Sequence, residues 1–193
     1  AAVVGLTGAS PTASAPALSW TASSGASAYR VRRDGTLIGT VATTTYVDTA
    51  TLADGAHAYA VEAVDAAGNV ATASTLAIVV DRTAPSAPAG LAAATPTASA
   101  PALTWSAATD ATSGVALYII ELDGQEIDAT TGTSYTDPTP RADGTRTYGV
   151  RAVDGAGNTS SAATFVVDVD TSTPGTPTSL AATSPTAAAP TLS

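Results

Sequence analysis

The sequence contains no cysteine, no methionine and no lysine, and it has a single histidine, His57, among 193 residues. Without cysteine, disulfide bonds cannot stabilise the fold. Zinc sites need clustered cysteine, histidine or carboxylate ligands, and no such cluster is visible along the chain. A serine or cysteine nucleophile needs a neighbouring base, and one histidine offers little material for that purpose. We therefore predict that these residues have no enzymatic activity.

Positive charge and long apolar runs are also scarce. The sequence has seven arginines and 16 acidic residues, so the net charge is -9 at pH 7. Nucleic acids and anionic membrane surfaces attract clustered positive charge, and we therefore expect neither as a partner. No run approaches the roughly 18 apolar residues of a transmembrane helix, so we expect no membrane insertion.

Large apolar side chains are sparse, because Leu, Ile, Val and Phe account for 33 of the 193 residues. Such a composition is typical of disordered chains when charge is also high. Here charged residues make up 12% of the chain, and the large apolar residues alternate with polar ones in short segments. A disordered segment has no reason to alternate, so the pattern indicates a folded protein.

What the chain does have is a long internal repeat. Residues 11–20 return as residues 96–105 with a single change, and residues 185–193 begin a third copy. A period of 85 to 89 residues is the length of a domain rather than of a solenoid unit. The predicted divisions are module 1 at 1–81, a proline-containing linker at 82–88, module 2 at 89–170, a second linker at 171–178 and the incomplete start of module 3 at 179–193. Paired prolines favour extended, semi-rigid linkers.

Each copy contains short segments with a period of two, which is typical of half-buried β-strands. Leu18 and Trp20 share one face of such a segment, and Tyr29 and Val31 begin another that runs into an Asp-Gly turn. Asp-Gly between alternating segments is a strong hairpin signal. No segment keeps a helical period for long. The pattern predicts an all-β chain of two tandem seven-stranded antiparallel β-sandwiches, followed by the start of a third.

A paired change of charge indicates which strands are neighbours. Arg32 and Glu62 occupy outward positions in the first copy, and Glu121 and Arg151 occupy the same positions in the second. Opposite charges across adjacent strands are favourable and like charges are not. We therefore expect the two strands to be adjacent in one sheet, with the residues of each pair directly opposite each other.

The segments at 29–35 (Tyr-Arg-Val-Arg-Arg-Asp-Gly), 52–55 (Leu-Ala-Asp-Gly) and 59–69 (Tyr-Ala-Val-Glu-Ala-Val-Asp-Ala-Ala-Gly-Asn) resemble bacterial fibronectin type III domains. They are also similar to the closely related bacterial immunoglobulin-like modules. The resemblance covers about residues 1–81 and 84–170. It implies an inward Trp on the second strand, a core Tyr on the sixth, and a spacer or display role in secreted bacterial proteins.

The aromatic residues give no sign of a ligand site that belongs to one copy and not to the other. Trp and Tyr occur in matched pairs, at 20/105, 29/118, 46/135 and 59/148. Residues shared by both copies are most simply explained as part of the fold. We therefore expect these rings to lie in the interior rather than to form a sugar-binding surface. For Tyr46 and Tyr135, exposure remains an alternative. Arg146 stands in the second copy where the first has His57. We therefore interpret His57 as a surface strand residue.

Most acidic residues lie in turns, where aspartate favours the turn through bonds to its own backbone. On that interpretation no cofactor or metal is required. One group also fits calcium, because the loop after the Trp105 strand and the turn after the Tyr148 strand should share one end of module 2, beside the incoming linker. Calcium prefers several hard oxygen ligands. The candidate ligands are Asp81, Asp110, Ser113, Asp154 and Asn158.

These observations predict a structural function. The leading interpretation is a non-catalytic spacer or display segment of a long exported bacterial protein, such as a stalk, an adhesin or a surface filament. One alternative is an accessory segment of a secreted polysaccharide-degrading enzyme, and another is a subunit of a phage or cell-surface assembly. Each predicts an extracellular or cell-surface location. The expected partners are neighbouring modules of the same chain and other copies in an assembly.

Overall fold

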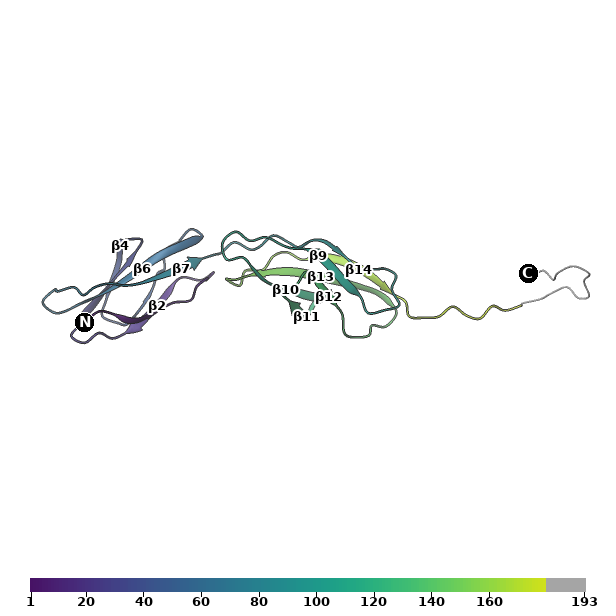
Figure 1. The fold of residues 1–193 in the computed structure, drawn as a ribbon, viewed down its shortest axis with the longest axis horizontal. Coiled ribbons are helices and arrows are strands. Elements are labelled where there is room, and N and C mark those ends of the chain that lie inside the picture. The colour runs from purple at the N-terminus through teal and green to yellow at the C-terminus, as the bar shows by residue number, and fades with distance from the viewer. Residues whose placement is uncertain (180–193) are drawn as a thin grey trace, which may run out of the picture.

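The computed structural model describes residues 1–179, and residues 180–193, which hold most of the predicted start of module 3, lie outside the described residues. Every helix or strand assigned in residues 1–179 is a β-strand, so the all-β prediction is confirmed. None of these residues forms a helix with the length and apolar character needed to cross a membrane. Figure 1 shows two elongated bodies in line, joined by the segment that follows β7 (Ser74–Val80).

The strands of the first body, module 1, form two antiparallel sheets. The smaller sheet has the order β1-β2-β5, with β1 at Val4–Thr7, β2 at Ala17–Thr21 and β5 at Thr45–Val47. The larger sheet has the order β4-β3-β6-β7, with β3 at Ala28–Arg33, β4 at Thr36–Val41, β6 at Gly55–Val64 and β7 at Ser74–Val80. The two sheets pack face to face as a β-sandwich.

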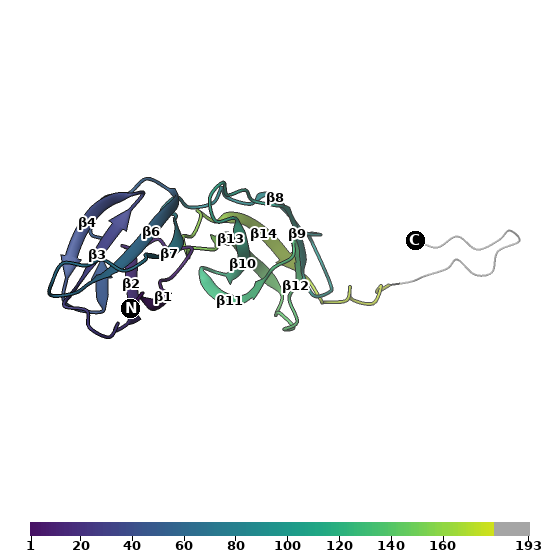
Figure 2. The ribbon, with the colours of Figure 1, turned by 60° about the vertical axis from the view of Figure 1, so that its left-hand side comes forward.

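The second body, module 2, repeats this arrangement (Figure 2). Its smaller sheet has the order β12-β9-β8, with β8 at Ala89–Ala92, β9 at Ala102–Ser106 and β12 at Ser134–Thr136. Its larger sheet has the order β11-β10-β13-β14, with β10 at Val115–Leu122, β11 at Gln125–Thr130, β13 at Gly144–Asp154 and β14 at Ala163–Val169. Module 2 has four more residues than module 1 between the paired Trp and Tyr, and its β9–β10 loop at 107–114 is two residues longer than the β2–β3 loop at 22–27.

The Asp-Gly turns connect the hairpins as predicted. Asp34 has a φ of 48° and Gly35 a φ of 79°, and the equivalent Asp123 and Gly124 have 50° and 81°. Two successive residues with positive φ form a turn whose twist matches that of the flanking strands. Asp tolerates this conformation better than most residues, and Gly adopts it without strain.

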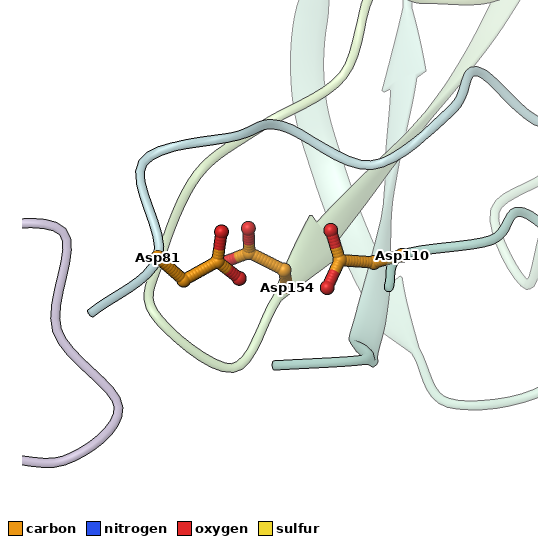
Figure 3. Close-up of side chains that lie close together, drawn as sticks. All are labelled: Asp81, Asp110 and Asp154. Atoms are coloured by element: carbon orange, nitrogen blue, oxygen red, sulfur yellow. The ribbon is translucent and has the colours of Figure 1, made fainter. Parts of the chain in front are cut away.

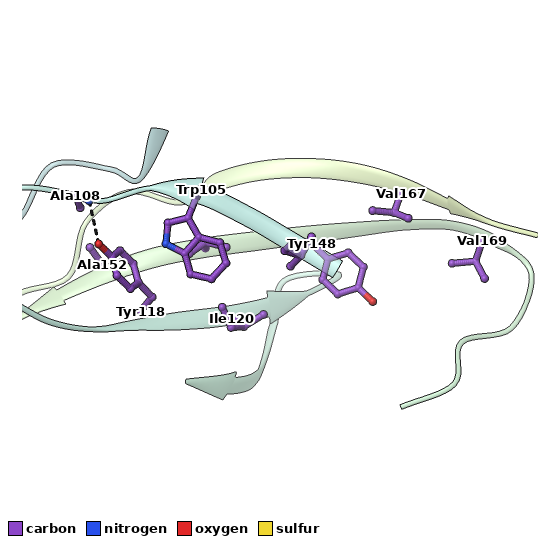
Figure 4. Packing of buried hydrophobic residues seen from close by; sticks show 10 residues of the cluster. Trp105, Ala108, Tyr118, Ile120, Tyr148, Ala152, Val167 and Val169 are labelled. Carbon is purple, nitrogen blue, oxygen red and sulfur yellow. Dashed lines mark hydrogen bonds between the residues drawn. The ribbon is translucent and has the colours of Figure 1, made fainter. Parts of the chain in front are cut away.

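The core of each module is built around one tryptophan on the smaller sheet. Trp20 is 6% exposed and meets the ring of Tyr29 edge to face at 5.4 Å, and Trp105 meets Tyr118 at the same distance. The Tyr118 hydroxyl accepts a 3.0 Å hydrogen bond from the backbone N–H of Ala108, which is drawn in Figure 4. Each buried aromatic side chain of this kind stabilises the fold by about 1.5–3 kcal/mol.

The sixth strand of each module contributes a completely buried tyrosine, as the resemblance implied. Tyr59 in β6 and Tyr148 in β13 are both 0% exposed. Figure 4 shows Tyr148 lying along the core between the sheets. The prediction that the paired indoles and phenols are interior is therefore confirmed at these positions. Tyr46 and Tyr135 are half-buried and pack against the same cores.

A buried carboxylate beside each of these tyrosines was not predicted from the sequence. Asp48 accepts a 2.8 Å hydrogen bond from the hydroxyl of Tyr59 and is also paired with Arg33. The guanidinium of Arg33 comes from the end of β3. Arg33, Asp48 and Tyr59 are far apart in the chain, so no local sequence pattern could reveal that they meet.

The predicted charge pairs form, but their register differs from the prediction. Arg32 pairs with Glu62 at 3.4 Å, and Arg151 pairs with Glu121 at 2.6 Å. The residue directly across from Glu62 is Arg30 rather than Arg32. Each pair is therefore diagonal across the two strands, a separation that long charged side chains can still span. The inference that the strands are neighbours holds, and the inference of direct opposition is wrong.

Candidate functional site

The segment between β7 and β8 is anchored to module 1 at its beginning. The backbone N–H of Asp81 donates to the carbonyl of Thr12 at 3.0 Å. Asp54 then accepts hydrogen bonds from the backbone of Arg82 at 3.0 Å and from the hydroxyl of Thr83 at 2.5 Å. These bonds lower the pKa of Asp54, with the Thr83 hydroxyl as the largest cause.

The same arrangement follows module 2. Hydrogen bonds from the hydroxyls of Ser172 and Thr171 and from the backbone of Thr171 lower the pKa of Asp143 to about 2. Asp143 is the second-copy counterpart of Asp54. An aspartate in the loop before the sixth strand therefore fixes the direction in which the chain leaves each module.

The junction segment is also held by module 2. The backbone N–H of Ser86 donates to the carbonyl of Thr109 at 2.9 Å, and the N–H of Thr109 donates back to the Ser86 hydroxyl at 2.9 Å. Pro11 of module 1 reaches Gly155 of module 2, where an added Cβ would lie 3.2 Å from the proline ring. The Pro11 ring of module 1 therefore lies close to the backbone of Gly155 in module 2, in addition to the connection through the linker.

Three carboxylates meet at this junction, as Figure 3 shows. They belong to Asp81 directly after β7, Asp110 in the β9–β10 loop and Asp154 at the end of β13, and one oxygen of each lies within 4.8 Å of the others. Asp81 is 0% exposed and Asp154 is 2% exposed. None of the ion pairs found in residues 1–179 involves any of the three, so their charges are not neutralised by an arginine there.

Backbone N–H groups hold each of the three carboxylates in place, and Asp110 accepts the most of these bonds. Oδ1 of Asp110 accepts hydrogen bonds from Thr112, Ser113 and Gly114 at 2.8 to 3.1 Å. Although desolvation raises the pKa of Asp110, these bonds outweigh it and lower the pKa overall, while the nearby charge of Asp54 opposes them. The Asp110 side chain therefore stays ionised at neutral pH.

Asp154 is held in a similar way by its own turn. Its Oδ1 accepts from the backbone N–H groups of Ala156 and Asn158 at 2.9 and 2.8 Å. Turn geometry alone therefore explains one oxygen of Asp110 and one of Asp154. It also explains Oδ1 of Asp81, which accepts from the N–H of Thr83 at 3.1 Å.

Two oxygen atoms at the junction have no such explanation. Oδ2 of Asp81 and Oγ of Ser113 are both buried and have no hydrogen-bond partner among the described residues. A buried polar atom without a partner is costly, and for a charged carboxylate the cost is larger. Both atoms belong to residues that the sequence analysis selected as candidate calcium ligands.

Asn158, the fifth candidate, does not turn its amide oxygen toward the acidic group, as a calcium ligand would. Its Nδ2 donates to Oδ2 of Asp154 at 2.7 Å and to the carbonyl of Asp81 at 3.0 Å. The amide nitrogen therefore faces the acidic group, and an amide nitrogen does not bind calcium. Asn158 ties the linker to the turn of module 2 and positions Asp154.

The same end of module 1 provides a comparison. Asp65 accepts hydrogen bonds from the N–H groups of Ala67 and Asn69 at 2.9 Å, and from Nδ2 of Asn69 at 2.8 Å. The turn thus matches that of Asp154 and Asn158. The segment from Trp20 to Tyr29 is four residues shorter than the segment from Trp105 to Tyr118, and no carboxylate group there accompanies Asp65 within residues 1–179. The acidic junction therefore depends on the insertion that carries Asp110.

The remaining candidates from the sequence are structural. Nδ1 of His57 lies 3.0 Å from Oδ2 of Asp34, and its Nε2 lies 3.0 Å from the carbonyl of Ala53. Both ring nitrogens are thus occupied, and neither contacts a serine. The hydroxyl of Tyr46 donates to the carbonyl of Ile38 at 2.9 Å. Neither residue offers a free reactive group.

Comparison with known proteins agrees with this architecture. Residues 13–82 match the family described as bacterial Ig-like domain. The fibronectin(III)-like modules of Clostridium thermocellum CbhA superpose with a TM-score of 0.56 at 19% identity, over 85% of this chain and 93% of theirs. Module 1 thus matches a bacterial Ig-like family, and the two modules together share the fold of fibronectin(III)-like modules. A chicken CNTN1 fragment of domains FN1–FN3 shares the fold, with a TM-score of 0.59 at 16% identity over 88% of this chain and 64% of that one.

Sequence relatives of these modules occur within larger proteins. Exoglucanase B of Cellulomonas fimi is 40% identical over 188 residues, which cover 90% of this chain and 17% of that protein. Exoglucanase A of the same organism is 42% identical over 197 residues, covering 92% and 23%. Chitinase A1 of Niallia circulans is 34% identical over 165 residues, covering 80% and 24%. The chain thus spans about a fifth of the length of these relatives.

Proposed function

We propose that the chain is a pair of non-catalytic accessory modules in a secreted enzyme that degrades an insoluble polysaccharide. The observation that carries this proposal is the alignment with two exoglucanases, which runs through both modules and covers 90% and 92% of the chain. Similarity confined to one module would indicate no more than a common fold. Similarity through the junction as well supports a shared arrangement of the pair.

The side chains of residues 1–179 support a non-catalytic role. Hydrolysis of a glycosidic bond uses two carboxyl groups that flank the bond in an open cleft. The one close group of carboxylates is Asp81, Asp110 and Asp154, and two of these are buried at the junction. His57 has both ring nitrogens engaged. On this proposal, catalysis belongs to another part of the enzyme, which acts outside the cell.

The leading sequence-based interpretation, a stalk, adhesin or surface filament, is less well supported than this alternative. The similar proteins named above are two exoglucanases and a chitinase, and none is named as an adhesin or filament. The spacer part of that interpretation is retained, because the modules act through their length and stiffness. The contacts of Asp54, Ser86 and Pro11 across the junction restrict bending between them.

The spacer proposal is tested by the complete reading frame and by deletion. We expect the gene to encode a glycoside hydrolase domain, and we expect residues 1–170 alone to hydrolyse neither cellulose nor chitin. Removing residues 1–170 from the full enzyme should lower activity on insoluble polysaccharide and leave activity on a soluble substrate unchanged. A reading frame with a cell-wall sorting signal and no hydrolase domain would restore the stalk interpretation instead.

A further inference from the structure

The acidic junction supports an inference that goes beyond a spacer function. We propose that Asp81, Asp110 and Asp154 bind a single calcium-type divalent cation, with Ser113 as an additional ligand, and that this cation locks the two modules together. The site combines Asp81, the last residue of module 1, with three residues of module 2, so it exists only where the two modules are joined.

The spacing of the carboxylates fits one shared ion. Calcium binds its oxygen ligands at about 2.3–2.6 Å, so two oxygens on opposite sides of one ion lie about 4.6–5.2 Å apart. The three carboxylate oxygens at the junction lie within 4.8 Å of one another. Figure 3 shows the three side chains directed toward a common region from three different segments.

The buried oxygens without partners are the observation that turn geometry leaves unexplained. Oδ2 of Asp81 is buried in a residue that is 0% exposed, and nothing in residues 1–179 donates a hydrogen bond to it. Oγ of Ser113, which lies in the same loop as Asp110, is buried without a partner as well. A cation at the centre of the group would satisfy both atoms and balance charges that otherwise repel.

The ligand chemistry selects the class of ion. The candidate ligands are carboxylate and hydroxyl oxygens, and hard oxygen ligands suit calcium and magnesium rather than zinc or copper. Magnesium requires a near-ideal octahedron, whereas calcium accepts irregular sets of about six to eight oxygens. Three carboxylates from separate loops form an irregular set, with water or backbone carbonyls supplying the remaining positions. Calcium is therefore the expected ion.

The expected consequence concerns the relation between the modules. Asp81 directly follows β7 of module 1, whereas Asp110 and Asp154 belong to module 2. A cation shared among them would hold the linker against the second module. Without it, three negative charges would repel one another and favour bending at the linker. The cation would thus act as a switch for the stiffness of the spacer.

The test uses the complete chain and a matched set of variants. Asp110→Asn and Asp81→Asn each remove one charge with almost no change in shape. Asp65→Asn is the control, because Asp65 occupies the same kind of turn in module 1 without partner carboxylates. Chelator-treated protein is titrated with calcium chloride in a calorimeter, and its melting temperature is followed by tryptophan fluorescence at fixed ionic strength.

We expect one calcium per chain and a higher melting temperature, by about 10 °C when calcium exceeds the Kd about 100-fold. The affinity should fall at least about tenfold in Asp110→Asn and in Asp81→Asn and stay unchanged in Asp65→Asn. Small-angle scattering should show a narrower distribution of particle lengths with calcium than with chelator. Absence of binding heat and of any melting shift at millimolar calcium would overturn the proposal. An equal loss in Asp65→Asn would do the same, because it would indicate general charge screening.

Discussion

The hydroxyl of Tyr148 donates a 2.6 Å hydrogen bond to Oδ2 of Asp137, and both residues are completely buried. Arg141 completes the group, with its Nε 2.6 Å from the same oxygen. In module 1 the corresponding Tyr59–Asp48 pair receives its arginine from another element. The carboxylate and the phenol are thus shared by the two copies, while the guanidinium has changed its position in the chain.

Replacing Tyr148 by Phe should destabilise module 2 by about 1–2 kcal/mol, because Asp137 loses one donor while Arg141 remains. Arg141→Leu should cost more, about 3 kcal/mol, because it leaves a buried charge without its ion pair. Urea unfolding of residues 82–178 in each variant measures both values. Equal costs for the two substitutions would contradict this explanation.

Acid should unfold both modules through these carboxylates. Burial raises the pKa of Asp137, but hydrogen bonds from Arg141 and Tyr148 outweigh it, so the pKa lies below its ordinary value. The pKa of Asp48 is lowered in the same way by Arg33 and Tyr59. A carboxylate with a lowered pKa stabilises the folded state above its unfolded pKa of about 3.9, and this stability is lost as the pH falls through the folded value.

Melting temperatures measured from pH 7 down to pH 2 should therefore stay nearly level and then fall below about pH 4. Arg141→Leu, which removes the main stabiliser of the ionised Asp137, should flatten the fall in module 2. A decline that begins above pH 5 in the unaltered chain would point to other groups.

His57 should make module 1 more stable in mild acid than in mild alkali. The carbonyl of Ala53 and the carboxylate of Asp34 raise the pKa of His57, in that order of importance. A histidine whose pKa is raised on folding stabilises the folded state at pH values below its unfolded pKa of about 6.5. This stabilisation is lost as the pH rises through its folded pKa. The pair with Asp34 is partly exposed, so the effect should stay below about 1 kcal/mol.

Proton NMR can follow this titration without ambiguity, because the chain has one histidine. The imidazole should titrate above its ordinary pKa in the intact chain and return toward it in Asp34→Asn. A value at or below the ordinary one in the intact chain would show that the two acceptors do not act on the ring.

The charge pair of module 1 should be invertible, since module 2 carries the inverted form. Arg32→Glu alone places two acids at neighbouring positions and should destabilise the module by about 0.5–1 kcal/mol. Adding Glu62→Arg should restore most of that loss. The coupling free energy from the four unfolding curves should lie between about 0.2 and 1 kcal/mol and should decrease in high salt. A coupling near zero would mean that the diagonal pair has no energetic role.

Several features were accessible from sequence because they depend on neighbours along the chain. Alternation at Leu18 and Trp20 indicated a strand with one buried face, and Asp34-Gly35 indicated a tight turn. Register was less accessible. The sign change of Arg32 and Glu62 showed that two strands are adjacent, but direct and diagonal pairs have the same signs, so the sequence could not separate them.

The buried acids show a different limit. Asp48 and Asp137 follow short strands and look like ordinary turn residues in the sequence. Their burial depends on a tyrosine 11 residues away and on an arginine that comes from different places in the two modules. Comparison of the two repeats finds residues at matching positions, but it misses the arginine, which stands at different sequence positions in the two modules.

By itself, the sequence determined that the chain is a tandem of all-β modules with aromatic cores, because these properties follow from periodicity, turn residues and repetition. The tertiary structure decided which side chains meet across the junction. It left Oδ2 of Asp81 without a partner, turned the Asn158 amide nitrogen toward the linker and set the diagonal register of the charge pairs. These outcomes depend on the orientation of side chains that are distant in the chain, which packing determines and local pattern does not.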